Sequence, residues 1–286
     1  MKYGIYLPNF GPCGDARTLA GLARDAEDAG WDGFFLWDHI AGWNLPFVDP
    51  WVALTAVALS TQRIRIGTTV TPVPRRRPWK LARETVSVDR LSGGRLTLGV
   101  GIGIRVEEWD HLGEQPDLKV RGQMLDESLA VLDGLWSGEP FEYSGRHYHV
   151  EKAQFLPTPV QQPRIPVWVG GFWPNKAPFR RAAQWDGVFP LFQADNESQE
   201  LAQLEQALAY TRAQRQAAAP LDVVCMGFTP GDDTARAADI VGQRSQRGGT
   251  WWLESLIPFR FGKGMTSDWT ADDMRKRILQ GPPLRK

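Results

Sequence analysis

Short apolar runs alternate with longer segments of mixed polarity along almost the whole chain. A short run that is apolar throughout is typical of a strand buried on both faces, and the mixed segments have the spacing of helices with one apolar face. The expected strands are Tyr3–Leu7, Gly33–Leu36, Ile64–Val70, Arg95–Val100, Ile165–Val169, Gly187–Pro190, Leu221–Met226 and Thr250–Leu256. The expected helices are Thr18–Ala29, Trp51–Ser60, one that begins at Pro78, Arg121–Leu135, Lys176–Gln184, Glu197–Ala218, Thr234–Arg244 and Asp272–Leu279. Eight such repeats favour an α/β fold, a closed (β/α)8 TIM barrel, over an open doubly wound sheet.

One stretch, between Gly138 and Pro166, does not follow this alternation. Aromatic residues alternate around Ser144 and Gly145, which predicts a β-hairpin. Prolines at positions 157, 159, 163 and 166 then predict an extended segment. We interpret the stretch as an insertion between the fourth helix and the fifth strand, within a single domain of residues 1–286.

Composition narrows the classes of function. Lysine plus arginine and aspartate plus glutamate number 33 each, so the formal net charge is zero, which argues against a nucleic-acid partner. No apolar run approaches the ~18 residues of a membrane span, and the N-terminus lacks the pattern of a signal peptide. Cys13 and Cys225 make neither a disulfide framework nor a metal site, so we expect a cytoplasmic protein. The 13 tryptophans could fill a core or line a pocket for a flat ligand.

In a barrel of this type the reacting groups lie in the loops after the strands. Asp38, His39 and Trp43 follow the second expected strand. His39 could transfer a proton near neutral pH, Asp38 could orient it, and Trp43 could stack on a planar ring or exclude water. The competing interpretation is a histidine that only caps the loop, with a surface tryptophan behind it.

Hydroxyl groups and free amides at the end of the third strand, around Thr69 and Val70, suit hydrogen bonding to a heterocycle with ring carbonyls. Arg75, Arg76 and Arg77 follow them. They could meet an anionic ligand through charge-assisted contacts. For each arginine taken singly, however, a solvated basic loop is the favoured interpretation.

Glycine recurs at positions 99, 101 and 103 after the fourth strand. Ile104 and Val106 stand where a G-x-G-x-x-G pattern needs its last glycine, so a Rossmann dinucleotide site is rejected. Glycines with a period of two predict a close approach of the backbone to a ligand or to a neighbouring strand. After the fifth strand, Gly170, Gly171 and Phe172 lead into a helix, and the exposed amides there are a candidate seat for a phosphate.

Other ionisable side chains allow two interpretations. Glu254, on the last strand, is either a carboxylate at the barrel mouth or the partner of an outer helix. Glu107 and Glu108, in the loop after the fourth strand, have the same two interpretations. His147 and His149 share a face of an expected strand, but two histidines rarely make a metal site. We expect no metal.

Several of these segments together resemble the luciferase-like monooxygenase family, over nearly the whole chain. They are Gly4-Ile5-Tyr6-Leu7-Pro8, Asp38-His39, and Asp89-Arg90-Leu91-Ser92-Gly93-Gly94-Arg95 followed by Leu98-Gly99-Val100-Gly101. The resemblance implies a barrel with FMN or the deazaflavin coenzyme F420 at the strand ends, its phosphate held by Gly170, Gly171 and Phe172. It also implies a non-proline cis peptide at Thr69-Val70, cofactor contacts from Thr69, Val70 and Ile102, and a homodimer.

This family divides by cofactor. Its deazaflavin-dependent sugar-phosphate dehydrogenases have an aspartate, a histidine and a tryptophan that Asp38, His39 and Trp43 match. They also use a glutamate after the fourth strand as proton donor, and Ile104 occupies the matching position here. Because the sequence departs from that pattern, it does not decide between FMN and F420 as the cofactor.

We therefore expect an oxidoreductase that acts on a small organic substrate, either as an FMN monooxygenase or by F420-dependent hydride transfer. His39 is expected to handle a proton, with Asp38 as its partner. The alternative is a non-catalytic flavin-binding protein on the same barrel. A hydrolase or aldolase is less favoured, because no expected strand ends in a lysine that could form a Schiff base.

Overall fold

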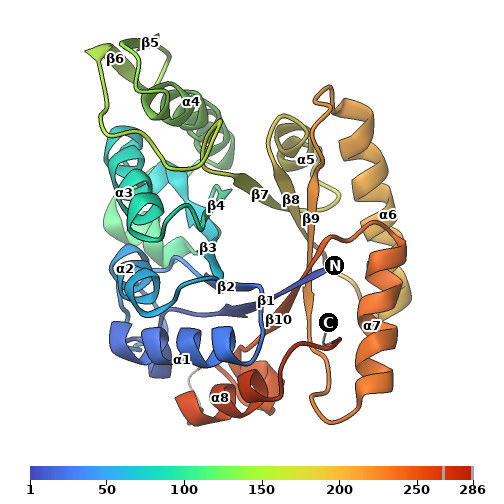
Figure 1. Cartoon of the computed structure of the whole chain (residues 1–286). Coiled ribbons are helices and arrows are strands. Elements are labelled where there is room, and N and C mark those ends of the chain that lie inside the picture. The colour runs from blue at the N-terminus through green and yellow to red at the C-terminus, as the bar shows by residue number, and fades with distance from the viewer. Residues whose placement is uncertain (266–267, 285–286) are drawn as a thin grey trace.

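Eight parallel strands close into a barrel in the computed structural model, which describes residues 1–265 and 268–284. The barrel strands are β1 (Lys2–Leu7), β2 (Gly33–Leu36), β3 (Arg65–Pro72), β4 (Leu96–Gly101), β7 (Val167–Phe172), β8 (Gly187–Leu191), β9 (Asp222–Gly227) and β10 (Trp251–Ser255). Each strand pairs with the next one of the barrel along the chain, and β1 pairs with β10 to close the circle (Figure 1). The expected (β/α)8 barrel, and with it the rejection of a Rossmann sheet, is confirmed.

The helices around the barrel begin at short polar side chains. They are α1 (Ala16–Asp28), α2 (Pro50–Ser60), α3 (Pro78–Leu91), α4 (Leu118–Trp136), α5 (Lys176–Ala182), α6 (Glu197–Gln214), α7 (Thr234–Gln246) and α8 (Ala271–Leu279). In every helix except α3, the side chain of the residue before the helix accepts a hydrogen bond from a backbone amide of the first turn. The capping residues are, in chain order, Asp15, Asp49, Asp117, Asn175, Asn196, Asp233 and Thr270. Helix α3 begins instead with Pro78, whose missing N–H would have no partner there. The expected bounds differ from these by a few residues, most of all in α6, which ends at Gln214 and not at Ala218.

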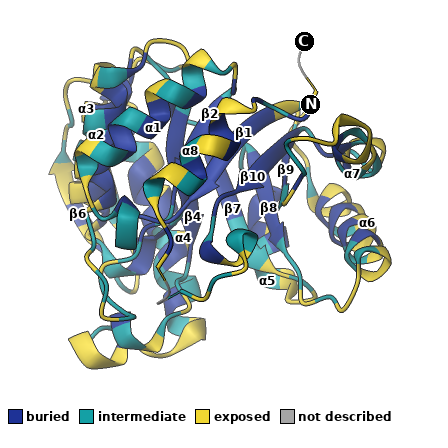
Figure 2. Ribbon diagram, turned by 90° about the horizontal axis from the view of Figure 1, so that it is seen from below, coloured by how far each residue is buried: buried dark blue, intermediate teal, exposed yellow. Residues whose placement is uncertain are grey.

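Two apolar cores hold the strands and helices together. The barrel interior contains Tyr6, Phe35, Trp168, Phe189, Val224, Trp251 and Leu253. The ring of Trp168 lies 5.0 Å from that of Phe35 and 5.2 Å from that of Trp251, so large aromatic groups fill the interior. Figure 2 shows the buried strands in dark blue inside a ring of helices with exposed outer faces. Because the interior is filled, a ligand has to bind at one end of the barrel.

A β-hairpin of β5 (Phe141–Ser144) and β6 (His149–Ala153) extends beyond α4, at the top of Figure 1. It lies between α4 and β7 in the chain, so the insertion expected there is confirmed. Glu127 of α4 accepts hydrogen bonds from the amides of residues 146–148 and fastens the hairpin turn. His147 lies in this turn and not in a strand, so the expectation that it shares a strand face with His149 is wrong.

The Asp89–Arg95 segment, which carries much of the family resemblance, supports the fold. Asp89 is fully buried and accepts hydrogen bonds from the amides of residues 160 and 161. Arg95 precedes β4 and donates to the carbonyl oxygens of Ala58 and Ile64. Both side chains therefore tie connecting segments to the amino-terminal end of the barrel.

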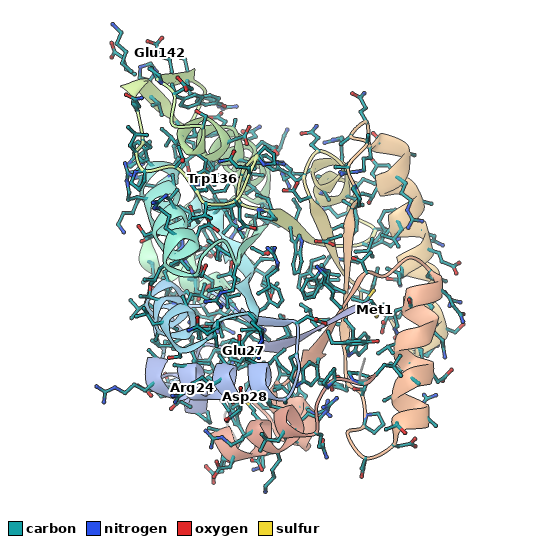
Figure 3. All side chains as sticks on the ribbon, in the orientation of Figure 1. Met1, Arg24, Glu27, Asp28, Trp136 and Glu142 are labelled. Atoms are coloured by element: carbon teal, nitrogen blue, oxygen red, sulfur yellow. The ribbon has the colours of Figure 1, made fainter. Side chains whose placement is uncertain are left out.

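Two side chains labelled in Figure 3 attach helices to their neighbours. Glu27 of α1 accepts hydrogen bonds from the amides of residues 62–64, directly before β3. The indole nitrogen of Trp136 in α4 donates to the Thr85 hydroxyl of α3 at 3.1 Å. These contacts fix the spacing of the elements whose far ends form the site described next.

Candidate active site

A cavity of about 730 Å³ opens at the carboxyl-terminal ends of the barrel strands. Tyr6 and Phe189, which belong to the filled interior, also line the cavity and form its floor. The walls come from the strand ends, the loops after β2 and β4, and helices α4 and α5. The lining includes Trp37, Asp38, His39, Thr69, Val70, Ile102, Ile104, Glu108, Lys119, Gln123, Asp126, Gly170, Gly171, Phe172 and Arg180. A volume of this size suits a small-molecule substrate or cofactor.

Val70 forms one wall of the cavity and sits between two glycines. A Cβ atom at Gly101 would lie 2.7 Å from one methyl group of Val70, and a Cβ atom at Gly170 would lie 2.8 Å from the other. Both positions must therefore lack side chains for Val70 to occupy this place. Gly101 is one of the period-two glycines, for which a close approach to a ligand or a neighbouring strand was expected. The peptide bond between Thr69 and Val70 is cis, as the resemblance implied.

Thr69 presents an unpaired hydroxyl group at the same wall. The residue is 3% exposed, and its Oγ1 atom has no hydrogen-bond partner among the described residues. Thr68 and Thr71 on the same strand instead bond within the protein, Thr68 to the carbonyl oxygen of Gly99 and Thr71 to the Thr68 hydroxyl. A buried hydroxyl without a partner costs about 1–3 kcal/mol, and a ligand with a ring carbonyl or ring nitrogen would satisfy it.

His39 faces the cavity with one ring nitrogen and a carboxylate with the other. Its Nδ1 atom lies 3.1 Å from Oε1 of Glu108, and its side chain is 16% exposed. Asn9 holds the backbone, since its side chain donates to the His39 carbonyl and accepts from the His39 amide. The Trp37 ring packs edge-on at 5.6 Å. An ionised carboxylate can only accept a hydrogen bond, so Nδ1 carries the proton and Nε2 is the free nitrogen.

The Glu108 carboxylate has three hydrogen-bond donors and one ion-pair partner around it. Besides His39, these are the amides of Ile40 at 2.6 Å and Ala41 at 3.4 Å, and Nη1 of Arg75 at 2.8 Å. Burial by itself raises the pKa of the Glu108 carboxyl. The hydrogen bond and charge of His39, the charge of Arg75 and the Ile40 amide outweigh that effect, so the pKa is lowered from its usual range. Glu108 is therefore an anion at neutral pH.

Asp38 is paired with two arginines and does not face His39. Arg75 donates to one carboxylate oxygen at 2.6 Å, and Arg76 donates to the other at 2.9 Å. The prediction that Asp38 orients His39 is therefore wrong, because successive side chains leaving a strand point to opposite sides. The side chains of Arg75 and Arg76 are 5% and 15% exposed. The interpretation of these two arginines as solvated is also wrong, whereas Arg77 is exposed.

Trp43 does not line the cavity. Its ring lies 3.5 Å from the guanidinium carbon of Arg105 and 4.7 Å from the ring of Phe10. The indole packs between the loops after β2 and β4. It joins these two loops next to His39. That Trp43 stacks on a bound ring or excludes water stays a prediction.

The candidate phosphate-binding residues lie at the end of β7. Gly170, Gly171 and Phe172 are its last three residues and line the cavity, so they belong to the strand and not to the loop after it. A Cβ atom at Gly171 would lie 2.2 Å from the ring of Pro178, which shows how closely α5 packs on this strand. Arg180 of α5 is exposed on the cavity wall and forms no ion pair with any residue in the described part of the chain. Ile102 also lines the cavity, directly after the neighbouring strand β4.

Glu254 points away from the cavity. It is fully buried, accepts hydrogen bonds from Thr229 and Trp252, and forms ion pairs with Arg260 and Arg277. Of its two interpretations, the partner of outer elements is the one observed. Glu107 pairs with Arg105 on its own loop.

Sequence reasoning left several lining residues unassigned. Lys119, Gln123 and Asp126 project from one face of α4. Their spacing of three to four residues was the signal that could have found them, since such residues share a helix face. Within residues 1–265 and 268–284, no group of His, Cys, Asp and Glu side chains has the arrangement of a metal site, and no helix is long and apolar enough to cross a membrane.

Comparison with known proteins identifies the family of this barrel. Residues 1–250 match the family model described as luciferase-like monooxygenase. The chain therefore belongs to the luciferase-like monooxygenase family, and the resemblance seen in the sequence is confirmed.

Two of the similar proteins are named for F420 and for a flavin. An F420-dependent glucose-6-phosphate dehydrogenase from Nakamurella multipartita is 34% identical over 178 residues, which cover 60% of this chain and 50% of that protein. The oxygenase component of a flavin-dependent trigonelline monooxygenase from Acinetobacter baylyi is 30% identical over 184 residues, 63% of this chain and 50% of that protein. The chain thus spans about half the length of the curated relatives it matches.

Solved structures show the same fold at low sequence identity. The coenzyme F420-dependent tetrahydromethanopterin reductase from Methanopyrus kandleri has a TM-score of 0.75 and 19% identity, covering 98% of this chain and 96% of that one. The monooxygenase RslO1 from Streptomyces bottropensis has a TM-score of 0.73 and 21% identity, covering 97% and 96%.

Proposed function

We propose that this chain is an oxidoreductase that binds FMN or coenzyme F420 in the cavity at the strand ends and acts on a small organic substrate. The observation that carries the proposal is the buried Thr69 hydroxyl, which has no protein partner and lines a cavity of the required size. The family supports it, since one relative is named as F420-dependent and another as flavin-dependent.

The chain offers suitable contacts for each part of such a cofactor. Thr69 would donate to or accept from a polar atom of the ring, and Val70 and Ile102 would pack on its apolar surface. The strand end at Gly170 and Gly171, with Phe172 and Arg180 beside it, would receive the phosphate; charge-assisted contacts of arginine with phosphate are strong. When bound, the cofactor supplies the hydride or oxygen chemistry, which the protein side chains lack.

His39 is the residue that we assign to proton transfer. Its Nδ1 atom is engaged by Glu108, so Nε2 is left to exchange a proton with a reactant in the cavity. The sequence departs from the sugar-phosphate dehydrogenases at Ile104, where they have a donor glutamate. Glu108 brings a carboxylate into the cavity four residues later, but as an anion it orients His39 and does not donate a proton.

Three further assignments belong to this proposal. The chain acts as a single domain of residues 1–286. It forms a homodimer, for which the apolar outer face of α2, with Val52 and Leu59 exposed, offers a surface. It resides in the cytoplasm, where the two buried free cysteines, Cys13 and Cys225, stay reduced.

Titration of the protein with FMN and with F420 tests the proposal. Thr69→Val keeps the shape of the side chain and removes the hydroxyl, so affinity for the bound cofactor should fall by about 5–10-fold. The matched control is Thr71→Val, which removes a hydroxyl bonded only within the protein and should leave affinity unchanged.

Three results would change the assignment. Failure of both cofactors to bind would refute the proposal. Equal affinity in wild type and Thr69→Val would place the ring elsewhere. Tight binding without turnover of any electron donor or oxidant would favour the non-catalytic flavin-binding alternative.

A further inference from the structure

Arg75 links two buried carboxylates: Asp38, which precedes His39 in the sequence, and Glu108, which contacts the His39 ring. Its Nη2 atom donates to Asp38 Oδ1 at 2.6 Å and to the Asp38 carbonyl oxygen at 3.0 Å. Its Nη1 atom lies 2.8 Å from Oε2 of Glu108, whose other oxygen faces Nδ1 of His39. The side chain thereby joins the loops after β2, β3 and β4 in one buried network.

We propose that Arg75 is a positioning residue, which holds Glu108 as an anion in the place where it keeps Nδ1 of His39 protonated and leaves Nε2 available to the cavity. This inference rests on the proposed function, because it gives Nε2 the task of exchanging a proton with the bound reactant. Nothing in the family resemblance assigned a role to this arginine.

The charges of the network are balanced, and Arg75 is central to that balance. Asp38 and Glu108 contribute two negative charges, and Arg75 and Arg76 two positive charges, all on side chains that are 15% exposed or less. Without Arg75, Glu108 would keep only His39 and the amides of residues 40 and 41 as partners. An uncompensated carboxylate favours a doubly protonated imidazole, and such a ring has no nitrogen left to accept a proton.

Other groups that contact His39 or the two carboxylates could also change the protonation of the His39 ring. Around the His39 ring itself are Glu108 and the rings of Phe10, Trp37 and Trp43. Arg76 contacts Asp38 and Glu84, and it has no contact with Glu108. Arg76 therefore supplies the matched control. Arg75→Gln and Arg76→Gln each remove one arginine from Asp38, but only Arg75→Gln also removes an arginine from Glu108.

Nitrogen-15 NMR of the histidine rings tests the proposal on the full-length protein without cofactor. The chain has four histidines, and the His39 signals are those that disappear in His39→Gln. In the wild type near pH 8, His39 should be a single neutral tautomer with the proton on Nδ1. In Arg75→Gln, the doubly protonated ring should persist to a pH about half to one unit higher, while Arg76→Gln should follow the wild-type curve.

A second variant covers the case in which Arg75→Gln does not fold. Arg75→Lys retains the charge, but its single ammonium group cannot hold both carboxylates in the same way, so its curve should lie between those of wild type and Arg75→Gln. In assays of turnover, the acid limb of kcat/KM should move in the same direction as the NMR curve.

Three results would overturn the proposal: a wild-type proton on Nε2, equal shifts in Arg75→Gln and Arg76→Gln, or no shift in any Arg75 variant that folds. The NMR measurement needs no cofactor. A chain that binds neither FMN nor F420 would therefore refute the proposed function and leave this test valid.

Discussion

Two glutamates, Glu108 and Glu254, are buried beside arginines near the same end of the barrel, but their surroundings differ. The Glu108 side chain is 1% exposed and pairs with Arg75, and the Glu254 side chain is fully buried and pairs with Arg260 and Arg277. Only Glu108 lines the cavity and contacts a histidine. A buried ion pair is thus not a sign of a reactive site by itself, since ion pairs also serve the fold. The cavity and the histidine contact make the difference.

Replacement of His39 should give the largest effect on turnover, because His39 contacts Glu108 in the cavity and has no contact with Glu254. We expect His39→Gln to lower turnover by roughly 10²–10⁴-fold, the usual contribution of a general acid or base. Cofactor affinity and thermal stability should change little, because Glu108 retains Arg75 and two amides as partners. Steady-state kinetics at saturating cofactor would measure the loss. Full activity in the variant, with a flat pH profile, would remove His39 from the mechanism.

Replacement of Glu254 should have the opposite pattern. Glu254→Gln leaves two arginines without their carboxylate, and loss of one partner of a buried pair destabilises by about 3–5 kcal/mol. Urea denaturation would measure the free energy of unfolding, and cofactor affinity of the folded protein should stay as in wild type. The control is Glu142→Gln at an exposed position of strand β5, labelled in Figure 3, which should change stability by less than about 0.5 kcal/mol. A large loss of affinity in Glu254→Gln would mean that the two glutamates are not functionally distinct.

Glu108 should give the stability of the protein a specific dependence on acid pH. Its pKa is lowered on folding, so it stabilises the folded state above the pKa of an unfolded glutamate, about 4.3. This contribution is lost as the pH falls through the lower pKa of the folded state. The difference in unfolding free energy between wild type and Glu108→Gln should therefore shrink from about pH 5 downward. A difference that stays constant down to acid unfolding would contradict the lowered pKa.

The barrel could be predicted from the sequence because its pattern is local. Strands buried on both faces read as short apolar runs, and caps such as Asp49 and Asp117 mark where helices begin. Gly170 to Phe172 were placed one element too late, because glycines next to a helix resemble a loop. All three are strand residues, and the two glycines make room for Val70 and Pro178.

The charged network could not be predicted in the same way, because its partners are far apart in the chain. His39 and Glu108 are separated by 69 positions, and Asp38 and Arg75 by 37. No local pattern relates such residues, whereas the adjacency of Asp38 and His39 suggested a pair that the backbone does not allow. Three arginines in a row also read as a solvated loop, although two of them neutralise buried carboxylates.

The central claim is that a flavin-type cofactor binds between the strand ends, with its ring at Thr69 and within reach of His39. A crystal structure of the protein with FMN or F420 tests this most directly. The account predicts a polar ring atom within hydrogen-bond distance of the Thr69 hydroxyl, the phosphate at Gly170 and Gly171, and a free Nε2 of His39 on the reactant side. A cofactor bound outside this cavity, or a ring with no contact to Thr69 and His39, would contradict it.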